Sequence, residues 1–287
     1  MRLAVFDDWR IGVVSGGGVS DITEALPGWS PRLGPSAVNE LIARFDELRP
    51  DIQRRVAAQT PRPLGQVRLR APVPRPTHLF AAPRNFREHQ NEMHGPLSGG
   101  GGSAADLGFF LKATGAISGP SDAIEVPSGT GRRFDYEGEV AFVIGKEARG
   151  VSREHALEYV FGYTIVIDAT LRMTETQREE RTMRKSFATF APMGPFVVTA
   201  DEIPDPSSLR LQLWRNGAMA QDACLKDLIV DIPGLIEQAS AILPLQPGDV
   251  YATGSPAGVG QIQPGDELIV EVEQIGRMVL PVRARAW

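Results

Sequence analysis

Apolar residues follow two different periods along the chain, and the helical period is found near the N-terminus. Between Val38 and Val56 they recur at intervals of three and four residues, which predicts an amphipathic helix that Pro50 should break or kink. Before this segment, the apolar runs RLAVF and RIGVV flank the turn-like DDW. Runs of this kind predict a small antiparallel sheet. The first part of the chain is therefore expected to combine a small sheet with a helix.

A proline-rich stretch, APVPRPTH over residues 71–78, separates this part from the rest of the chain. Its prolines, at 72, 74 and 76, predict a stiff connector. Beyond the connector, several segments have the composition of strands: LGFFLKA, EVAFVIG, YTIVID, GPFVVTA, LRLQLW, DVYATG and ELIVEVE. The dipeptide Asn216-Gly217 predicts a type I′ hairpin, so the sheet should be at least partly antiparallel. Residues 152–160 and 232–243 have the pattern of helices.

The regular alternation of strands and helices that marks a doubly wound fold is missing from this pattern. We therefore predict a β-rich α+β fold. A small N-terminal α/β domain is expected over residues 1–72 and a larger domain over residues 73–287. The larger domain is expected to carry the chemistry.

Composition narrows the class of function. The 287 residues are 42% hydrophobic and 23% charged, which is typical of a soluble globular protein. A net charge of −5, without a basic run interleaved with aromatic residues, does not favour binding to nucleic acid. Asp7 and Asp8 interrupt the N-terminus and no apolar run reaches the length of a membrane helix, so we expect a cytoplasmic protein without membrane association. Cys224 is the only cysteine and can form no intrachain disulfide.

Two glutamates stand one residue apart at the start of the buried-strand pattern EGEVAFVIG. Because side chains alternate along a strand, Glu137 and Glu139 should point to the same face, about 7 Å apart along the backbone. Asp168 ends the apolar run YTIVID, where a buried strand opens into a loop. Three converging carboxylates would suit Mg²⁺, Mn²⁺ or Ca²⁺ better than Zn²⁺. Taken alone, the E-x-E spacing is more typical of a solvated strand edge.

Four longer stretches include these acids or follow them: DYEGEVAFVIGK, GYTIVIDATLR, KSFATFAPMGPFVVTADEIPDP and LPLQPGDVYATGSPAGVG. They resemble, in the same order, the signature blocks of the fumarylacetoacetate hydrolase family, and the similarity runs from about residue 76 to about residue 283. The resemblance implies a mixed β-sandwich roll, a homodimer, and Mg²⁺ or Mn²⁺ held by Glu137, Glu139 and Asp168.

A further stretch, RNFREHQNEMHG, resembles the lid block of the same family, with Phe86 in place of the usual tyrosine. The match implies that His89 and Glu92 form a catalytic dyad, in which the carboxylate orients the imidazole that activates water. Alone, H-x-x-E is more typical of a solvated helix face. The glycine run Gly99–Gly102 follows, and such a flexible segment fits either a lid that closes over the substrate or a surface linker.

Other candidate residues come from the same blocks. Lys185, in KSFATF, matches a catalytic family lysine that faces the substrate. Thr253 and the backbone of Gly254 match residues that contact the substrate carboxylate. Without the resemblance, Lys185 would be expected on the surface and a tight turn would explain Gly254.

Three more residues flank the expected site in sequence: Arg84, Asn85 and Arg172. They are candidates for substrate binding, and the two arginines would suit a distal carboxylate. The chain departs from the family pattern at Ile167, where an asparagine commonly precedes the metal-binding aspartate, and at Ala81–Pro83. These departures bear on the substrate class more than on the metal site.

The resemblance implies a divalent-metal-dependent hydrolase that cleaves a C–C bond in an acylpyruvate-like or 2,4-dioxo acid through a metal-bound enolate. Two other interpretations stay open. One is a decarboxylase or isomerase of oxaloacetate-like or oxo-dienoate acids, whose reactions pass through the same kind of enolate. The other is a non-catalytic protein of the same fold that binds a small oxo acid.

Overall fold

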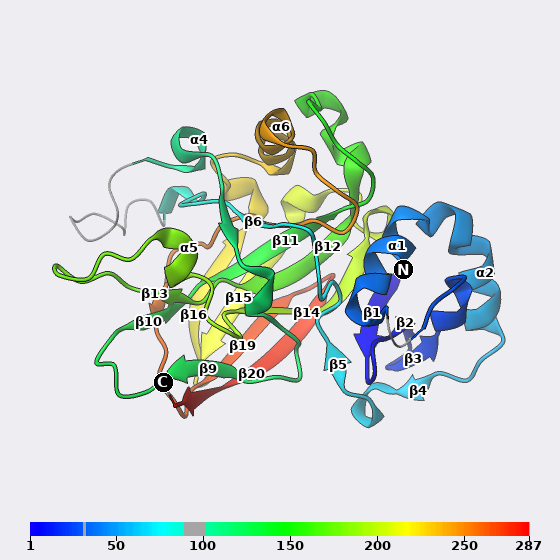
Figure 1. The fold of residues 1–287 in the computed structure, drawn as a ribbon, viewed down its shortest axis with the longest axis horizontal. Coiled ribbons are helices and arrows are strands. Elements are labelled where there is room, and N and C mark those ends of the chain that lie inside the picture. The colour runs from blue at the N-terminus through cyan, green and yellow to red at the C-terminus, as the bar shows by residue number, and fades with distance from the viewer. Residues whose placement is uncertain (31–32, 89–101, 287) are drawn as a thin grey trace.

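Strands dominate the computed structural model, which describes residues 1–30, 33–88 and 102–286 (Figure 1). The predicted β-rich α+β class is confirmed. The described helices are short: α1 (Ala37–Ala43), α2 (Phe45–Ala57), α4 (Ala104–Leu107), α5 (Arg181–Arg184) and α6 (Ile232–Ile242). None of them is long and apolar enough to cross a membrane.

The described strands form three sheets. The largest runs in the order β4 (Arg62–Pro63), β3 (Gly18–Asp21), β2 (Arg10–Ser15), β1 (Arg2–Phe6), β14 (Ala191–Thr199), β12 (Val160–Ile167), β11 (Gly138–Ile144), β17 (Val250–Ala252), β6 (Leu79–Ala81), β7 (Phe110–Lys112), with β5 (Leu69–Arg70) beside β1 and β8 (Ile117–Ser118) beside β14. The second contains β13 (Thr170–Leu171), β10 (Phe134–Tyr136) and β18 (Gly260–Gln261). The third contains β16 (Ala218–Cys224), β15 (Arg210–Arg215), β19 (Glu267–Val272), β20 (Gly276–Arg285) and β9 (Ile124–Pro127).

The centre of the largest sheet is buried on both faces. Every residue of β11 and β12 is buried, which explains why their sequences are continuously apolar apart from Glu139 and Thr164. The two strands pair antiparallel, with Gly138 opposite Ile167. This register places Glu137, which precedes β11, beside Asp168, which follows β12.

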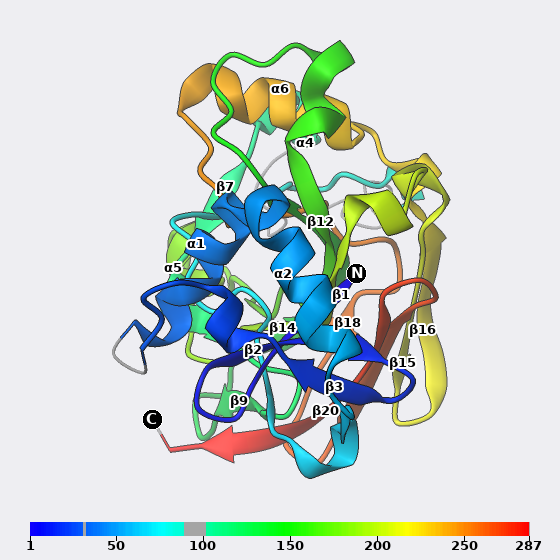
Figure 2. The same cartoon turned by 90° about the vertical axis from the view of Figure 1, so that its right-hand side faces the viewer.

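The N-terminal strands extend the largest sheet. The predicted antiparallel pairing of β1 and β2 is confirmed, and β1 also pairs antiparallel with β14, with Leu3 opposite Val197. Helices α1 and α2 lie with these strands at one end of the molecule, on the right in Figure 1, and this end faces the viewer in Figure 2. Apolar residues of α1 and β1 share a core with Val143 of β11. The division into residues 1–72 and 73–287 stays a prediction.

The predicted N-terminal helix is correct in place but breaks at a different residue. The helical segment is interrupted at Arg44, between α1 and α2, and α2 continues through Pro50. The break expected at Pro50 is therefore wrong. Proline removes one backbone N–H from the helix, but Leu48 and Ile52 on either side of it remain buried and hold the helix against the core.

Three other local predictions have different outcomes. The hairpin is confirmed, because β15 and β16 pair antiparallel and both Asn216 and Gly217 have positive φ angles, of 51° and 79°. Helix α6 also lies where it was predicted. Residues Arg153–Tyr159 instead form a 3₁₀ helix, in which Ala156 is the buried residue. With so narrow a buried face, no apolar stripe favours the α-helical period there.

Candidate metal centre and active site

Three buried carboxylates meet at the end of the central strands. Glu139 lies on β11, Glu137 directly precedes that strand, and Asp168 directly follows β12. The backbone N–H of Asp168 donates to the carbonyl of Glu137 at 2.7 Å. One carboxylate oxygen from each residue lies within 4.8 Å of the others. The structure therefore assembles the acid cluster that the sequence predicted.

Cations hold two of these three carboxylates. Lys185 Nζ donates to Glu137 Oε2 at 2.7 Å and also pairs with Asp168. Lys112 is buried and pairs with the other oxygen of Asp168. Arg172 Nη2 donates to Glu137 Oε1 at 2.6 Å. The protein itself thus orients the carboxylates of Glu137 and Asp168 through these pairs.

Glu139 has a different environment. Its Oε2 accepts a hydrogen bond from the backbone N–H of Gly254 at 2.8 Å, and no cation of the described residues lies within ion-pair distance. Burial raises the pKa of Glu139 well above its ordinary value, and the negative charges of Asp168 and Glu137 raise it further. A divalent cation would offset both effects. A buried, oxygen-only and incompletely neutralised cluster fits Mg²⁺, Mn²⁺ or Ca²⁺.

The pKa values of the two buried lysines are shifted in opposite directions. Burial alone would lower the pKa of Lys185, but the charges of Asp168 and Glu137 outweigh it, so this pKa is raised and the ammonium stays protonated. The pKa of Lys112 is lowered, mainly by burial. Sequence reasoning missed Lys112. A single lysine inside the apolar strand pattern LGFFLKA was the signal for a buried cation with an acidic partner.

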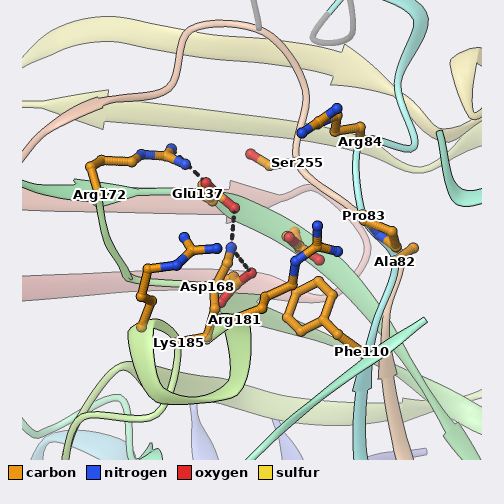
Figure 3. Close-up of a pocket in the computed structure, with 12 residues that line it drawn as sticks. Ala82, Pro83, Arg84, Phe110, Glu137, Asp168, Arg172, Arg181, Lys185 and Ser255 are labelled. Carbon is orange, nitrogen blue, oxygen red and sulfur yellow. Dashed lines mark hydrogen bonds and ion pairs between the residues drawn. The ribbon is translucent and has the colours of Figure 1, made fainter. Parts of the chain in front are cut away.

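The carboxylates open into a pocket (Figure 3). Lys185 lines it, together with Arg84, Phe110, Arg172, Arg181, Arg184 and Ser255. Arg181 and Arg184 belong to α5, which leads directly into Lys185. Neither arginine was predicted, although three cations within the five residues RTMRK beside a predicted site lysine could have indicated them.

The two arginines predicted to bind substrate occupy different positions. Arg172 Nε donates to Asp135 Oδ2 at 2.6 Å, in addition to its bond with Glu137, so its guanidinium is engaged by two acids. Burial would lower the pKa of Arg172, but Glu137 and Asp135 outweigh it and raise this pKa. Arg84 lines the pocket from a backbone with a φ angle of 47°. Substrate binding by either residue stays a prediction.

Asn85, Thr253 and Gly254 hold the pocket wall together. Asn85 Nδ2 donates to the carbonyl of Thr253 at 2.9 Å, and the Thr253 hydroxyl donates to the carbonyl of Val140 at 2.8 Å. Gly254 has a φ angle of 101°, and an added Cβ would lie 2.8 Å from the Cβ of Asn85. Only glycine therefore allows the approach that presents its N–H to Glu139. Contacts of these three residues with substrate stay predictions.

The proposed dyad of His89 and Glu92 lies outside the described residues, and so do Gly99–Gly101. Gly102 is described and has a φ angle of 108°. The predicted lid therefore stays a prediction.

Comparison with known proteins identifies the family. Residues 78–283 match the family model described as fumarylacetoacetate (FAA) hydrolase, C-terminal. A maleylpyruvate hydrolase of Aquipseudomonas alcaligenes is 39% identical over 300 residues, which cover 99% of this chain and 100% of that protein.

Solved structures agree with this match. The maleylpyruvate hydrolase of Sphingobium sp. SYK-6, in complex with manganese(II) and pyruvate, has a TM-score of 0.86 and 39% identity over 99% of each chain. A probable 2-hydroxyhepta-2,4-diene-1,7-dioate isomerase of Mycobacterium abscessus has a TM-score of 0.81 and 27% identity over 100% of this chain and 99% of that one. The resemblance stated from the sequence blocks is confirmed, and the chain belongs to the fumarylacetoacetate hydrolase family.

Proposed function

We propose that this protein is a metal-dependent hydrolase of acylpyruvates, which are 2,4-dioxo acids, and that it cleaves the C–C bond joining the acyl group to pyruvate. The observation that carries the proposal is the buried cluster of Glu137, Glu139 and Asp168 beside Lys185. The relative from Aquipseudomonas alcaligenes supports the substrate class. The Sphingobium structure, with manganese(II) and pyruvate, supports the cofactor and the pyruvate half of the substrate.

Each charged group of the cluster has a role in this reaction. Glu137, Glu139 and Asp168 would hold Mn²⁺ or Mg²⁺, which supplies a Lewis acid for a substrate carbonyl. The protonated Lys185 complements the negative charge that develops on the pyruvate half as the C–C bond breaks. Lys112 and Arg172 keep the carboxylates of Asp168 and Glu137 oriented before substrate arrives.

Hydrolysis also needs a base. A water molecule must lose a proton and add to the acyl carbonyl, and the electron pair of the broken C–C bond then stays on the pyruvate half. We assign the base to His89, oriented by Glu92, because the sequence around them resembles the lid block of the family. The neutral imidazole would accept the proton at its unprotonated nitrogen.

The relative kcat/KM values for an acylpyruvate and for oxaloacetate distinguish a hydrolase from a decarboxylase. Since a water-activating base is required only for hydrolysis, we expect kcat/KM for an acylpyruvate to exceed that for oxaloacetate in the same Mn²⁺-loaded preparation. Substitution His89→Ala should lower kcat for the acylpyruvate by about 10²-fold and leave the affinity of a metal-chelating inhibitor nearly unchanged. Loss of enol absorbance and release of carbon dioxide measure the two reactions.

A preference for oxaloacetate that survives in the His89→Ala variant would replace the hydrolase proposal with the decarboxylase. The isomerase interpretation also has support, from the Mycobacterium abscessus neighbour. Isomerisation of an oxo-dienoate would be followed in the same preparation. A non-catalytic binding protein is less well supported, because such a protein has no need for a buried lysine between two carboxylates.

Three further expectations complete the proposal: use of Mg²⁺ and a homodimer follow from the family resemblance, and the cytoplasmic location follows from the sequence pattern. We propose that Mg²⁺ can replace Mn²⁺, since both prefer oxygen ligands. We also propose a cytoplasmic homodimer. Sedimentation velocity would give the mass of the assembly in solution, and a value near the 31.1 kDa of one chain would contradict the dimer.

A further inference from the structure

The pocket carries more positive than negative side chains. Five cationic residues line it, against three carboxylates: Arg84, Arg172, Arg181, Arg184 and Lys185 against Glu137, Glu139 and Asp168. A divalent metal ion would add to this excess. A pocket of this charge favours a substrate with more than one anionic group.

Four of the five cations already have acceptors in the protein. Lys185 and Arg172 pair with the carboxylates of the cluster or with Asp135 beside it. Arg184 is buried, and its Nε donates to the carbonyl of Glu179 at 3.0 Å. Arg84 Nη1 donates to the carbonyl of Gly102 at 3.5 Å. Arg181 is therefore the pocket cation for which the described part of the chain supplies no hydrogen-bond acceptor or acid.

The surroundings of the Arg181 guanidinium differ from those of the other pocket cations. No carboxylate of the described part of the chain lies within ion-pair distance of its guanidinium, which stacks over the ring of Phe110 at 5.3 Å from the centroid. The Nζ of Lys185 lies 5.2 Å from the same centroid. The separation of the two cations thus cannot exceed the sum of these distances. Phe110 keeps Arg181 close to the acid cluster, and the N–H groups of this arginine have no acceptor among the residues that the structure describes.

Arg84 lies on the same pocket, and its backbone is strained. A φ angle of 47° is unfavourable for a residue with a side chain and is typical of functional sites. Burial lowers the pKa of Arg84, and the positive charges of Arg181 and Arg172 lower it further. Figure 3 shows the Arg84 and Arg181 side chains at this pocket with Ser255. An anion bound beside the two arginines would relieve their repulsion.

We propose that Arg181, assisted by Arg84, binds a second carboxylate at the acyl end of the substrate and makes the site selective for dicarboxylate acylpyruvates over monocarboxylate ones. The proposal rests on the proposed function, because that function places the 2-oxo acid end at the metal cluster. Arg172, which the sequence suggested for this role, is engaged by Glu137 and Asp135 instead.

Binding of ligands that cannot be hydrolysed tests the carboxylate site by itself. Calorimetry with Mn²⁺-loaded protein would compare 2-oxoheptanedioate with 2-oxoheptanoate, which has the same chain length and lacks the second carboxylate. We expect the wild type to prefer the dicarboxylate by about 10-fold or more, as for a hydrogen bond between charged groups. Arg181→Gln should reduce this preference to less than about 3-fold, and Arg181→Lys should retain part of it.

Arg178→Gln is the matched control. Arg178 is exposed, lies three residues before Arg181 and does not line the pocket, so this variant has the same change in net charge. It should keep the full preference. Melting temperatures close to that of the wild type would show that each variant is folded. A wild type without preference, or an Arg181→Gln variant that keeps it, would overturn the assignment.

Turnover separates this inference from the proposed function. The kcat/KM of a dicarboxylate 2,4-dioxo acid would be compared with that of its terminal methyl ester. We expect Arg181→Gln to raise KM for the acid by about 10-fold and to change KM for the ester by less than about 3-fold. Equal losses for acid and ester would overturn the assignment. A preference in ligand binding without any hydrolysis would support the carboxylate site and contradict the hydrolase.

Discussion

Substitution Glu139→Gln is expected to abolish Mn²⁺ binding and to lower kcat/KM by at least about 100-fold, while making the metal-free protein more stable to heat. Metal binding is lost because the variant lacks one of the three charged ligands. Stability rises because the wild-type carboxylate is buried beside Asp168 and Glu137, whereas the neutral amide can still accept the N–H of Gly254. Calorimetry with Mn²⁺ and differential scanning calorimetry without metal measure the two effects.

Glu147→Gln is the control for this substitution. Glu147 is exposed, and its change to glutamine removes the same charge from the protein. It should leave Mn²⁺ affinity and melting temperature nearly unchanged. Unchanged Mn²⁺ affinity in Glu139→Gln would exclude Glu139 as a ligand. A lower melting temperature of the metal-free variant would contradict the charge repulsion.

The raised pKa of Glu139 also fixes the sign of the pH dependence. A carboxyl group whose pKa is higher in the folded than in the unfolded protein favours folding most when it is protonated. The metal-free protein should therefore lose this contribution as pH rises from the ordinary carboxyl value towards the raised one. Mn²⁺ must displace the same proton, so its affinity should fall as pH is lowered through this range.

Substitution Lys185→Met is expected to have the opposite effect on the metal-free protein and an equally large effect on activity. The apolar side chain removes the one cation that pairs with both Glu137 and Asp168, and only Arg172 and Lys112 then remain as their partners, which should destabilise the metal-free protein by about 3 kcal/mol. Activity should fall by about 10²-fold or more because the developing charge loses its partner. Mn²⁺ should still bind and should raise the melting temperature more than in the wild type.

Lys226→Met is the matched control, since Lys226 is exposed. Thermal unfolding with and without Mn²⁺, together with kcat/KM, measures the expected differences. If Lys185→Met kept wild-type activity, Lys185 would have no catalytic role and would serve only the folding of the acid cluster. If the variant bound no Mn²⁺, the lysine would be needed to assemble the ligands.

Much of the candidate site could be predicted because its acidic residues lie on strands or directly beside their ends. The two glutamates on one strand face, and the aspartate at the end of the next strand, are separated by a fixed geometry once β11 and β12 pair. The signature blocks placed Lys185 at the same site, and in the structure it pairs with Glu137 and Asp168. The Asn216-Gly217 hairpin was predictable for a similar reason, since its turn depends on two adjacent residues.

Other features depend on packing between distant segments and could not be predicted locally. Lys112 reaches Asp168 only because β7 forms the edge of the largest sheet beside β6. Whether an arginine binds a protein acid or remains available depends on which acids surround it, and this distinguishes Arg172 from Arg181. The same limit applies to α2, where tertiary burial outweighs the helix-breaking tendency of Pro50.

The sequence by itself determined the strand-rich class, the family, the three carboxylates and the lysine beside them, because these follow from the period of two along a strand and from long ordered blocks. Only the tertiary structure decided how the charges pair. It engages Arg172, Arg184 and both lysines with protein acceptors, whereas no acid of the described residues pairs with Arg181. The physical reason is that the strength of an ion pair depends on distance and burial, which chain folding sets between residues far apart in sequence.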